Sequence, residues 1–476
     1  MESLNRQAQF QSIPTMKNER TCGFWDATFI NTGWAIATWC FLTGALTASL
    51  VDFKTAIFCT VFGNMLGVMI MLIAEISVTV KYGIDTYPAM VSFLGRNGMK
   101  FMLIFFVLLN LGWVAVLSLM FSRAVQNIYE AISGNVSPPA MFTAVAIIAV
   151  LITWLLVYKG VRAIAWMNRI VVPCLAVLMI VMFYFIMTGY GADAVFSSKA
   201  LAPYDNHIVN IILCIELNVG AGLSWYASLG SLTRTTKTSR GAMWANVIGV
   251  NFMADVACLL GAAAAYVIGG DDPTTWMIPL GGLVLGGLGL IFVMIGNITS
   301  NAIVMYATCL GLKQFKFFAG ISWLKTTALF VLPVLILLFF PDFVYGNYQI
   351  LLNGSAAFFA SLAAVQFVDF IMMRKGYLDL RSVYNNKESS AFRYWGGVNW
   401  GGFISIIVGG VVYCLLLNPL TWEYSGALLV FKSVSIPAFL VAGILYLIWA
   451  TAVMKPSGKG SIEEYKRYFA AVKGNQ

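Results

Sequence analysis

Residues 31–38 read Asn-Thr-Gly-Trp-Ala-Ile-Ala-Thr and stand in the middle of an apolar run from residue 25 to residue 49. About 20 apolar residues are enough for a helix to cross the hydrocarbon core of a membrane. Glycine and short polar side chains weaken such a helix at mid-span, so we expect the first membrane helix to be interrupted here. Unwound backbone at membrane depth needs cover from protein or a cavity.

The whole chain has the composition of a membrane protein. Hydrophobic residues make up 60% of it and charged residues 10%, whereas a soluble domain carries roughly 25% charged residues. The apolar stretches are longer than the roughly ten-residue strands of a membrane barrel, so helices must satisfy the backbone in lipid. We predict an all-α polytopic membrane protein with twelve transmembrane helices, near 25–49, 56–80, 101–129, 139–158, 164–189, 207–232, 242–269, 277–311, 323–340, 346–373, 398–418 and 434–453.

The basic residues support the count of twelve. If the N-terminus is cytoplasmic, 25 of the 29 lysines and arginines fall in the two tails and the even-numbered loops, as the positive-inside rule requires. One span more or fewer would scramble this sorting. We therefore expect a multi-pass protein of the cell (inner) membrane with cytoplasmic tails, 1–24 and 454–476, around a transporter domain, 25–453. The net charge of +9 then signals orientation, and no nucleic-acid partner is expected.

Other classes of function find little support. Seven of the eight cysteines lie inside apolar spans and none forms a CxxC or CxxH pair, so we expect neither a disulfide frame nor a cysteine metal site. A GxxxxGK[ST] motif is absent, which argues against ATP hydrolysis. The single histidine, His207, stands at a helix end, away from any nucleophile or base. We expect a carrier rather than an enzyme, with a small-molecule solute and membrane lipids as partners and no obligate protein partner.

Three acidic residues lie within predicted spans, where charge is costly and usually functional. Glu75 lies two turns before Lys81, and a structural contact is the favoured role. Asp255 lies one turn after Asn251, and a packed polar contact and a functional role are equally compatible with that spacing. Glu216 is the strongest candidate for a functional role among the three, because it comes just before a second weak point in a helix.

That second weak point is in the sixth span. Asn218 is followed by Val219-Gly220-Ala221-Gly222, and two glycines in mid-span weaken a helix. We expect a break here; the alternative is that the glycines pack closely against a neighbouring helix. Paired breaks in the first helix of each half are typical of five-plus-five inverted repeats. The expected repeats are 25–189 and 207–373, followed by two extra helices in 398–453.

Two further spans carry candidate ligands. The eighth contains Gly296, Thr299 and Ser300. Its hydroxyls either bond to carbonyls one turn earlier or join free carbonyls of a broken helix in a cage for a monovalent cation. In the third span, Asn110 stands three residues before Trp113, on the same side of the helix. The tryptophan is either core or a stacking face, with the amide as a hydrogen-bonding edge for a flat polar heterocycle.

At these residues the sequence resembles the nucleobase:cation symporter family 1, which includes cytosine permeases and the hydantoin carrier. Each matching motif is short, but their order and spacing hold from about Gly23 to Pro456. The motifs are Gly63-Asn64, Lys81-Tyr82-Gly83-Ile84, Gly112-Trp113, Trp166-Met167-Asn168 with Pro173, Thr299-Ser300-Asn301 with Tyr306-Ala307, Asp369 before Arg374-Lys375, and Tyr394-Trp395-Gly396-Gly397-Val398-Asn399-Trp400.

The resemblance implies the ten-helix inverted repeat plus two helices, and a sodium ion as coupling ion between spans one and eight. By position, its ligands would be the carbonyls of Gly33, Ile36 and Gly296 and the hydroxyls of Thr299 and Ser300.

The resemblance also implies a flat substrate held between aromatic groups, with Trp113 as one of them and Asn110 beside it. The second ring of the family falls near Val219, Gly220 and Ala221, where this chain has none, and Ala37 stands where relatives carry an aromatic residue or an amide. Trp34 or Trp225 is a candidate replacement ring.

The sequence thus predicts a sodium-coupled symporter that imports a purine, a pyrimidine or a related heterocycle by alternating access. The candidate substrate-binding residues are Trp34, Ala37, Asn110, Trp113, Glu216, Asn218, Val219 and Gly220. The alternative is a carrier of a cationic amine or guanidine-like solute that uses Glu216, and a channel or receptor is a weaker one.

Overall fold

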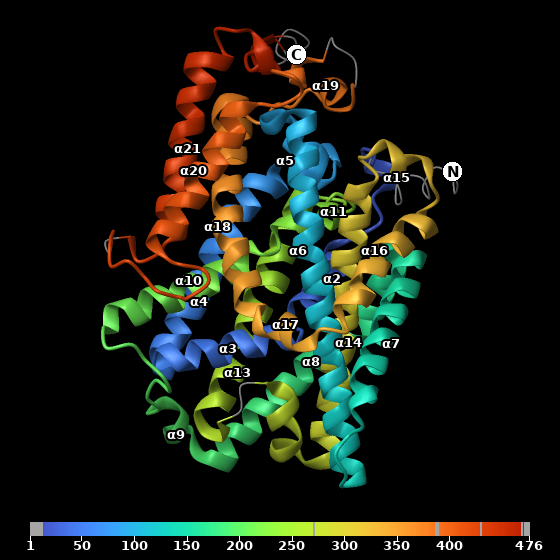
Figure 1. The fold of residues 1–476 in the computed structure, drawn as a ribbon, viewed down its shortest axis with the longest axis vertical. Coiled ribbons are helices and arrows are strands. Elements are labelled where there is room, and N and C mark those ends of the chain that lie inside the picture. Colours follow the sequence, from blue (N-terminus) through green and yellow to red (C-terminus); the bar gives the residue numbers. More distant parts are fainter. Residues whose placement is uncertain (1–12, 270–271, 386–389, 429–430, 468–469, 471–476) are drawn as a thin grey trace.

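The computed structural model describes residues 13–269, 272–385, 390–428, 431–467 and 470. The described chain is a bundle of helices (Figure 1). The first five spans are α2 (Phe24–Ala35) with α3 (Thr38–Leu50); α4 (Phe53–Met71), η2 (Leu72–Ile76) and α5 (Ser77–Tyr82); α6 (Thr86–Ser133); α7 (Pro139–Lys159); and α8 (Val161–Ile186) with η3 (Met187–Gly191).

The second five spans follow in the same order. They are α10 (His207–Leu223) with α11 (Tyr226–Thr233); α12 (Ser239–Asn246), η4 (Val247–Met253) and α13 (Ala254–Ile268); α14 (Pro273–Leu312); α16 (Trp323–Leu337); and α18 (Tyr348–Phe367) with η5 (Val368–Met373). The chain ends with α20 (Trp400–Leu416) and α21 (Ser435–Trp449) with η8 (Ala450–Met454). Short helices connect them: α9 (Ala192–Phe196), α15 (Lys316–Gly320), α17 (Pro341–Gly346) and α19 (Leu380–Tyr384).

The same irregularities recur in both sets of five. The third span of each set is kinked at a glycine with positive φ, Gly95 (φ 75°) and Gly282 (φ 67°), where only glycine adopts the conformation without strain. The second and fifth spans of each set contain a π-helical segment. The first span of the first set is bent by 56° between α2 and α3, and that of the second set is interrupted by a turn at Ser224 and Trp225 between α10 and α11. The predicted five-plus-five repeat with broken helices one and six is therefore present.

The predicted break in the sixth span is misplaced by a few residues. The helix α10 continues through Val219–Gly222, and the chain leaves the regular helix at Ser224 and Trp225. The glycines serve close helix contacts: a methyl group added at Gly222 would lie 2.7 Å from the carbonyl oxygen of Asn64 in α4, and one added at Gly220 would lie 3.2 Å from the β-carbon of Ala356 in α18. The alternative that the glycines pack against a neighbour is thus the correct one.

Length and hydropathy separate the twelve predicted spans into two groups. In the described chain, nine helices are long and apolar enough to cross a membrane, and the pair α2–α3, bent by 56°, makes a tenth. The helices α16 and α20 are apolar but have 15 and 17 residues, fewer than the roughly 20 of a full span. The largest boundary difference is at α6, which begins at Thr86 because the segment before the Gly95 kink is also helical.

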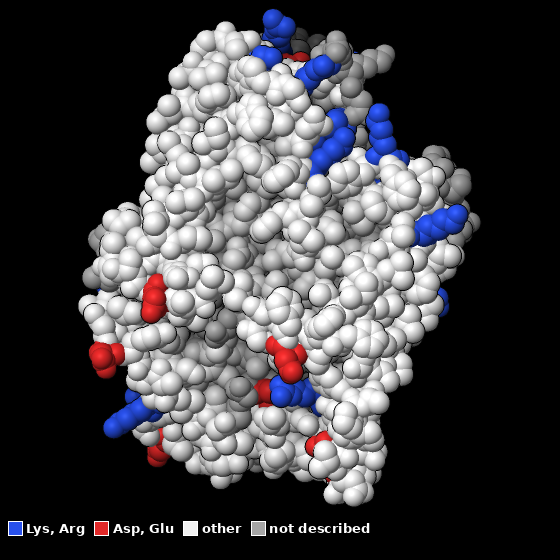
Figure 2. Space-filling model, in the orientation of Figure 1, with Lys and Arg blue, Asp and Glu red and all other residues white. Residues whose placement is uncertain are grey.

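Charge is distributed unevenly along the bundle. Lysine and arginine side chains gather at the end where α5, α15 and α19 lie, while acidic side chains on this face lie mainly toward the other end (Figure 2). The described N-terminal segment also lies at the basic end, where the amide of Thr15 donates to the carbonyl of Gly83 over 2.7 Å. This polarity matches the sorting of basic residues in the sequence.

Buried charges at this end have partners. Asp369 forms a 2.8 Å ion pair with Arg374 and accepts hydrogen bonds from Ser92 (2.7 Å) and Tyr446 (2.8 Å), which joins α6, η5 and α21. Glu75 accepts hydrogen bonds from the Thr86 hydroxyl and, over 3.1 Å, from the amide of Gly230. Glu75 therefore ties η2 to α6 and α11, in agreement with the expected structural role.

Candidate transport site

The interruption of the first span lies at Ile36 and Ala37. Their backbone angles (φ −83°, ψ 85° and φ −133°, ψ 172°) are not helical, and α3 leaves at 56° to α2. Asn297 of α14 holds the second half in place: its side-chain oxygen accepts from the amide of Thr38 and its nitrogen donates to the Thr38 hydroxyl, both over 2.9 Å. An asparagine far away in sequence thus satisfies the first turn of α3, a role that sequence reasoning missed.

Close packing fixes the first half of the broken helix. A methyl group added at Gly33 would lie 1.8 Å from the side-chain oxygen of Asn168, so α8 approaches α2 at a distance that only glycine permits. The nitrogen of Asn168 donates to the carbonyl of Ile164 over 3.0 Å. Gly33 is therefore needed for helix contact, in addition to any role of its carbonyl.

Oxygen atoms converge where α2 meets α14. The hydroxyl oxygen of Thr299 lies 3.0 Å from the carbonyl oxygen of Gly33 and 2.9 Å from that of Gly296. The carbonyl oxygen of Ile36 is adjacent, since a methyl group added at Gly296 would lie 2.5 Å from it. One hydroxyl proton can serve only one of two carbonyls at a time, whereas a cation attracts all of these oxygens together. The donor set suits a hard monovalent cation.

Four tryptophans surround a small cavity beside this cluster. The cavity has a volume of about 30 Å³, which is room for about two water molecules. Its lining comes from both broken helices and from α6 and α14: Trp34, Trp39, Asn110, Trp113, Leu117, Ser224, Trp225, Ser228, Ser300 and Val304. Ser300 therefore lines the cavity one residue away from Thr299, so the two candidate sites adjoin.

The tryptophan rings pack edge to face. The centroid of Trp225 lies 4.5 Å from that of Trp34, with 79° between the planes, and 5.0 Å from that of Trp39, with 66°. Trp39 in turn lies 6.4 Å from Trp113, at 74°. Edge-to-face packing leaves no parallel slot, so a flat ring can stack on Trp113 only after these side chains move apart.

Polar groups of the cavity are partly engaged. The side-chain nitrogen of Asn110 donates to the Thr308 hydroxyl over 2.8 Å, which leaves its oxygen to face a ligand. The Ser224 hydroxyl donates to the carbonyl of Ala221 over 2.7 Å. The indole N–H of Trp225 is buried, and the described residues provide no acceptor for it. A ligand carbonyl would satisfy that donor.

Of the predicted substrate-binding residues, Trp34, Asn110 and Trp113 come together in this cavity. Ala37 caps α3 and is not part of the lining. Asn218 donates to the Cys214 carbonyl (2.8 Å) and the Thr47 hydroxyl (3.3 Å). Val219 and Gly220 lie inside α10, outside the lining.

Glu216 lies outside the lining of the tryptophan cavity. Its carboxylate accepts hydrogen bonds from the Ser433 hydroxyl (2.8 Å), from the amides of Val434 (2.8 Å) and Ser435 (3.0 Å), and from the Ser435 hydroxyl. These groups begin α21, where a negative charge is favoured by the helix dipole. Glu216 is therefore a structural cap for the last helix, and the cationic-solute alternative loses the residue on which it depended.

The structure adds cavity residues that the sequence analysis did not select. Trp39, two residues after Ala37, is one of them. Trp225, which the sequence analysis names only as a candidate replacement ring, lies at the interruption of span six and also lines the cavity. Leu117 and Val304 stand four residues after Trp113 and Ser300, so helical spacing was the available signal for them. In the described part of the chain, histidine, cysteine and acidic side chains form no cluster of three that could hold a metal ion.

Two repeats of five helices, interrupted first helices and a cavity at the interruptions are the architecture typical of secondary transporters. The chain belongs to the family described as permease for cytosine/purines, uracil, thiamine, allantoin, whose model matches residues 14–428. The predicted membership of nucleobase:cation symporter family 1 is thereby confirmed.

Individual proteins agree with this family. A hydantoin permease from Microbacterium maritypicum is 22% identical over 417 residues, which cover 82% of this chain and 80% of that protein. The structure of Mhp1, a nucleobase-cation-symport-1 family transporter, closed with bromovinylhydantoin bound, superposes with a TM-score of 0.78 at 19% identity, covering 94% of this chain and 96% of Mhp1. A Na⁺-coupled sialic acid symporter has the same fold, with a TM-score of 0.61, 12% identity and 94% coverage of both chains.

Proposed function

We propose that this protein is a sodium-coupled symporter for a flat, polar heterocycle of the hydantoin or nucleobase kind. The observation that carries the proposal is the contiguity of the two sites: Thr299 belongs to the oxygen cluster and Ser300 to the tryptophan cavity. A sodium ion drawn to the oxygens of Gly33, Ile36, Gly296, Thr299 and Ser300 would fix the break of span one against α14. The cavity wall is built on that same break.

The tryptophan cavity accounts for the substrate class. Aromatic faces favour a flat ring, and the oxygen of Asn110 with the N–H of Trp225 offers one acceptor and one donor, the pattern found along the edge of a cyclic imide, ureide or nucleobase. Because the cavity measures about 30 Å³, the rings have to move apart to admit a substrate of this class.

Alternating access then follows from the two breaks. Sodium and substrate each stabilise the arrangement of α2, α3 and α14 that the other binds, so each raises the affinity of the other by the same factor. The basic end of the bundle, which carries the described N-terminal segment, is the cytoplasmic side in this proposal, and the protein resides in the cell membrane.

Uptake by purified protein in liposomes tests the proposal. Radiolabelled hydantoins, purines and pyrimidines are offered with and without an inward sodium gradient. Accumulation above the outside concentration, dependent on sodium, is the expected result, and equilibration without accumulation would instead indicate a channel.

A matched pair of variants tests the cavity. Trp225→Phe removes the buried indole N–H, while Trp25→Phe removes one from a side chain that is 65% exposed. Loss of one hydrogen bond costs about 1 kcal/mol, or roughly fivefold in affinity. We expect that loss of substrate affinity for Trp225→Phe and none for Trp25→Phe.

A further inference from the structure

Asp255 is a buried acid in the seventh span that the transport site does not use. It lies in the first turn of α13 and is 4% exposed. One carboxylate oxygen accepts from the side-chain nitrogen of Asn64 over 2.8 Å, and the other from that of Asn251 over 3.2 Å. Within the described residues it has no ion pair.

The surroundings of Asp255 contain little to balance a negative charge. The nearby titratable groups are Cys40 of the packed helix α3 and Cys258 of α13 itself, and α4 presents the amide of Asn64. Neither thiols nor amides carry positive charge. An isolated carboxylate in such an environment is expensive, and acids at this depth in membrane proteins commonly exchange ions or protons.

A line of asparagines leads from Asp255 toward the basic end of the bundle. Asn251 and Asn246 precede it on the same span, across the π-helical segment η4. Asn31 of α2 packs against Gly249 between them, since a methyl group added at Gly249 would lie 2.6 Å from the Asn31 β-carbon. One amide atom of each of the three asparagines is buried with no partner among the described residues.

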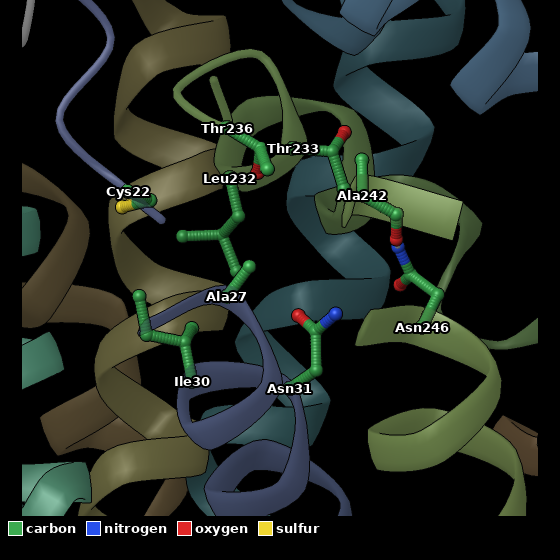
Figure 3. A pocket seen from close by; sticks show the side chains of 9 residues that line it. All are labelled: Cys22, Ala27, Ile30, Asn31, Leu232, Thr233, Thr236, Ala242 and Asn246. Atoms are coloured by element: carbon green, nitrogen blue, oxygen red, sulfur yellow. Dashed lines mark hydrogen bonds between the residues drawn. The ribbon is translucent and has the colours of Figure 1, made fainter. Parts of the chain in front are cut away.

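The far end of this line opens on a small cavity. The amides of Asn31 and Asn246 both extend into it (Figure 3), and Cys22, Leu232, Thr233 and Thr236 form the side toward the basic end. Its volume of about 10 Å³ is room for about one water molecule. Polar atoms without protein partners beside such a space are suited to hold water, and water between amides conducts protons.

We propose that Asp255 is a proton-binding site that exchanges protons with the cytoplasmic side along Asn251, Asn246 and Asn31. In the loading step, a hydronium ion in the cavity passes its proton through bridging water to the carboxylate, which becomes a neutral carboxyl and leaves one water molecule. Unloading is the reverse, and no other bond changes.

A proton fits this site better than a metal cation does. Both amides turn their nitrogen atoms toward Asp255, so neither side chain contributes an oxygen ligand beside the carboxylate. A sodium ion needs several oxygens, as the cluster around Thr299 supplies. Protonation also has a structural consequence, because a neutral carboxyl holds the Asn64 N–H less strongly and loosens the contact between α4 and α13.

Infrared spectroscopy of the full-length protein tests the site without reference to transport. The absorption of a protonated carboxyl is followed from acidic to alkaline pH in wild type, Asp255→Asn and Asn64→Ala. We expect a titrating band in wild type that is absent from Asp255→Asn. In Asn64→Ala the band persists to higher pH, because the charged form has lost a hydrogen-bond donor.

A band that survives unchanged in Asp255→Asn, or a wild-type band that does not titrate, would overturn the proposal. If Asp255→Asn fails to fold, the test is whether the carboxyl band of Asn64→Ala titrates at higher pH than that of wild type. An unchanged titration in Asn64→Ala rejects the assignment of the band to Asp255. Uptake at saturating sodium supplies a second measurement: its pH dependence should be lost in Asp255→Asn. Absence of any sodium-driven uptake in wild type contradicts the proposed function but leaves the infrared result standing.

Discussion

The hydroxyl oxygen of Thr299 lies 3.0 Å from the carbonyl oxygen of Gly33, and this contact joins α14 to the first half of the broken first span. The two residues are 266 positions apart in the sequence. A hydroxyl gives one proton while two carbonyls approach it, so in the proposed mechanism a cation would strengthen the junction. Occupancy of this point by sodium would therefore control the angle between α2 and α3.

The first prediction concerns Thr299. Thr299→Ala removes the hydroxyl oxygen, and the loss of a ligand to a charged group costs about 1.5–3 kcal/mol, or roughly ten- to a hundredfold in sodium affinity. Thr299→Ser keeps the oxygen and should remain near wild type. Sodium titrations of substrate uptake measure both. Normal uptake by Thr299→Ala at low sodium would refute the ion assignment.

The second prediction uses two glycines of α14. Gly296→Ala places a methyl group 2.5 Å from the carbonyl oxygen of Ile36, whereas Gly287→Ala meets nothing within 4 Å. We expect Gly296→Ala to push α3 away from α14 and to abolish sodium stimulation, while Gly287→Ala transports normally and is slightly more stable. Uptake and melting temperature are the measurements. Equal behaviour of the two variants would mean that the break is not packed against Gly296.

The third prediction concerns the cap made by Glu216. Glu216→Ala leaves the amides of Val434 and Ser435 and the Ser433 hydroxyl without their acceptor, at about 1–3 kcal/mol for each buried group. The melting temperature in detergent should fall clearly. The exposed Glu423→Gln, in the loop before α21, serves as control and should melt as wild type does. The order of preference among substrates should be unchanged in both, and a changed order for Glu216→Ala would restore Glu216 to the substrate site.

The fourth prediction concerns the N-terminal segment at the basic end. The amide of Cys22 donates to the carbonyl of Thr235 (3.1 Å), the amide of Lys237 donates to the carbonyl of Cys22 (3.0 Å), and the thiol is buried. Burial raises the pKa of the Cys22 thiol, and the thiolate is the reactive form. Alkylation by a maleimide should therefore be slow and should accelerate only at higher pH than for an ordinary cysteine.

An exposed position in the same segment gives the comparison. Asn18→Cys in a Cys22→Ser background should react about tenfold faster or more at neutral pH. Peptide mass spectrometry after timed alkylation distinguishes the two sites from the other cysteines. Equal rates would show that the N-terminal segment readily dissociates from the connection between α11 and α12 in solution.

The sequence determined the helices, their order and the place of the first break, because these are local consequences of lipid. Each helix satisfies its own backbone hydrogen bonds, so the length and hydropathy of a segment indicate a membrane span without knowledge of the neighbouring helices. The glycine and short polar side chains of residues 31–38 likewise predicted an interruption of the first helix, and the break lies at Ile36 and Ala37. Two of the candidate oxygen ligands, Thr299 and Gly33, do lie in contact, and their role as sodium ligands stays a prediction.

Only the tertiary structure decided which side chains meet. A residue turns about 100° around the helix axis at each step, and each π-helical segment shifts that register, so sequence does not tell which neighbour a side chain faces. Glu216 meets Ser433 across 217 positions and not the substrate cavity. Trp39 and Trp225 come from different repeats, yet they pack together beside Trp113. In lipid, each helix is determined by its own residues, because its backbone hydrogen bonds are made within the segment. A binding site depends instead on how helices remote in the chain are rotated and which side chains they bring into contact.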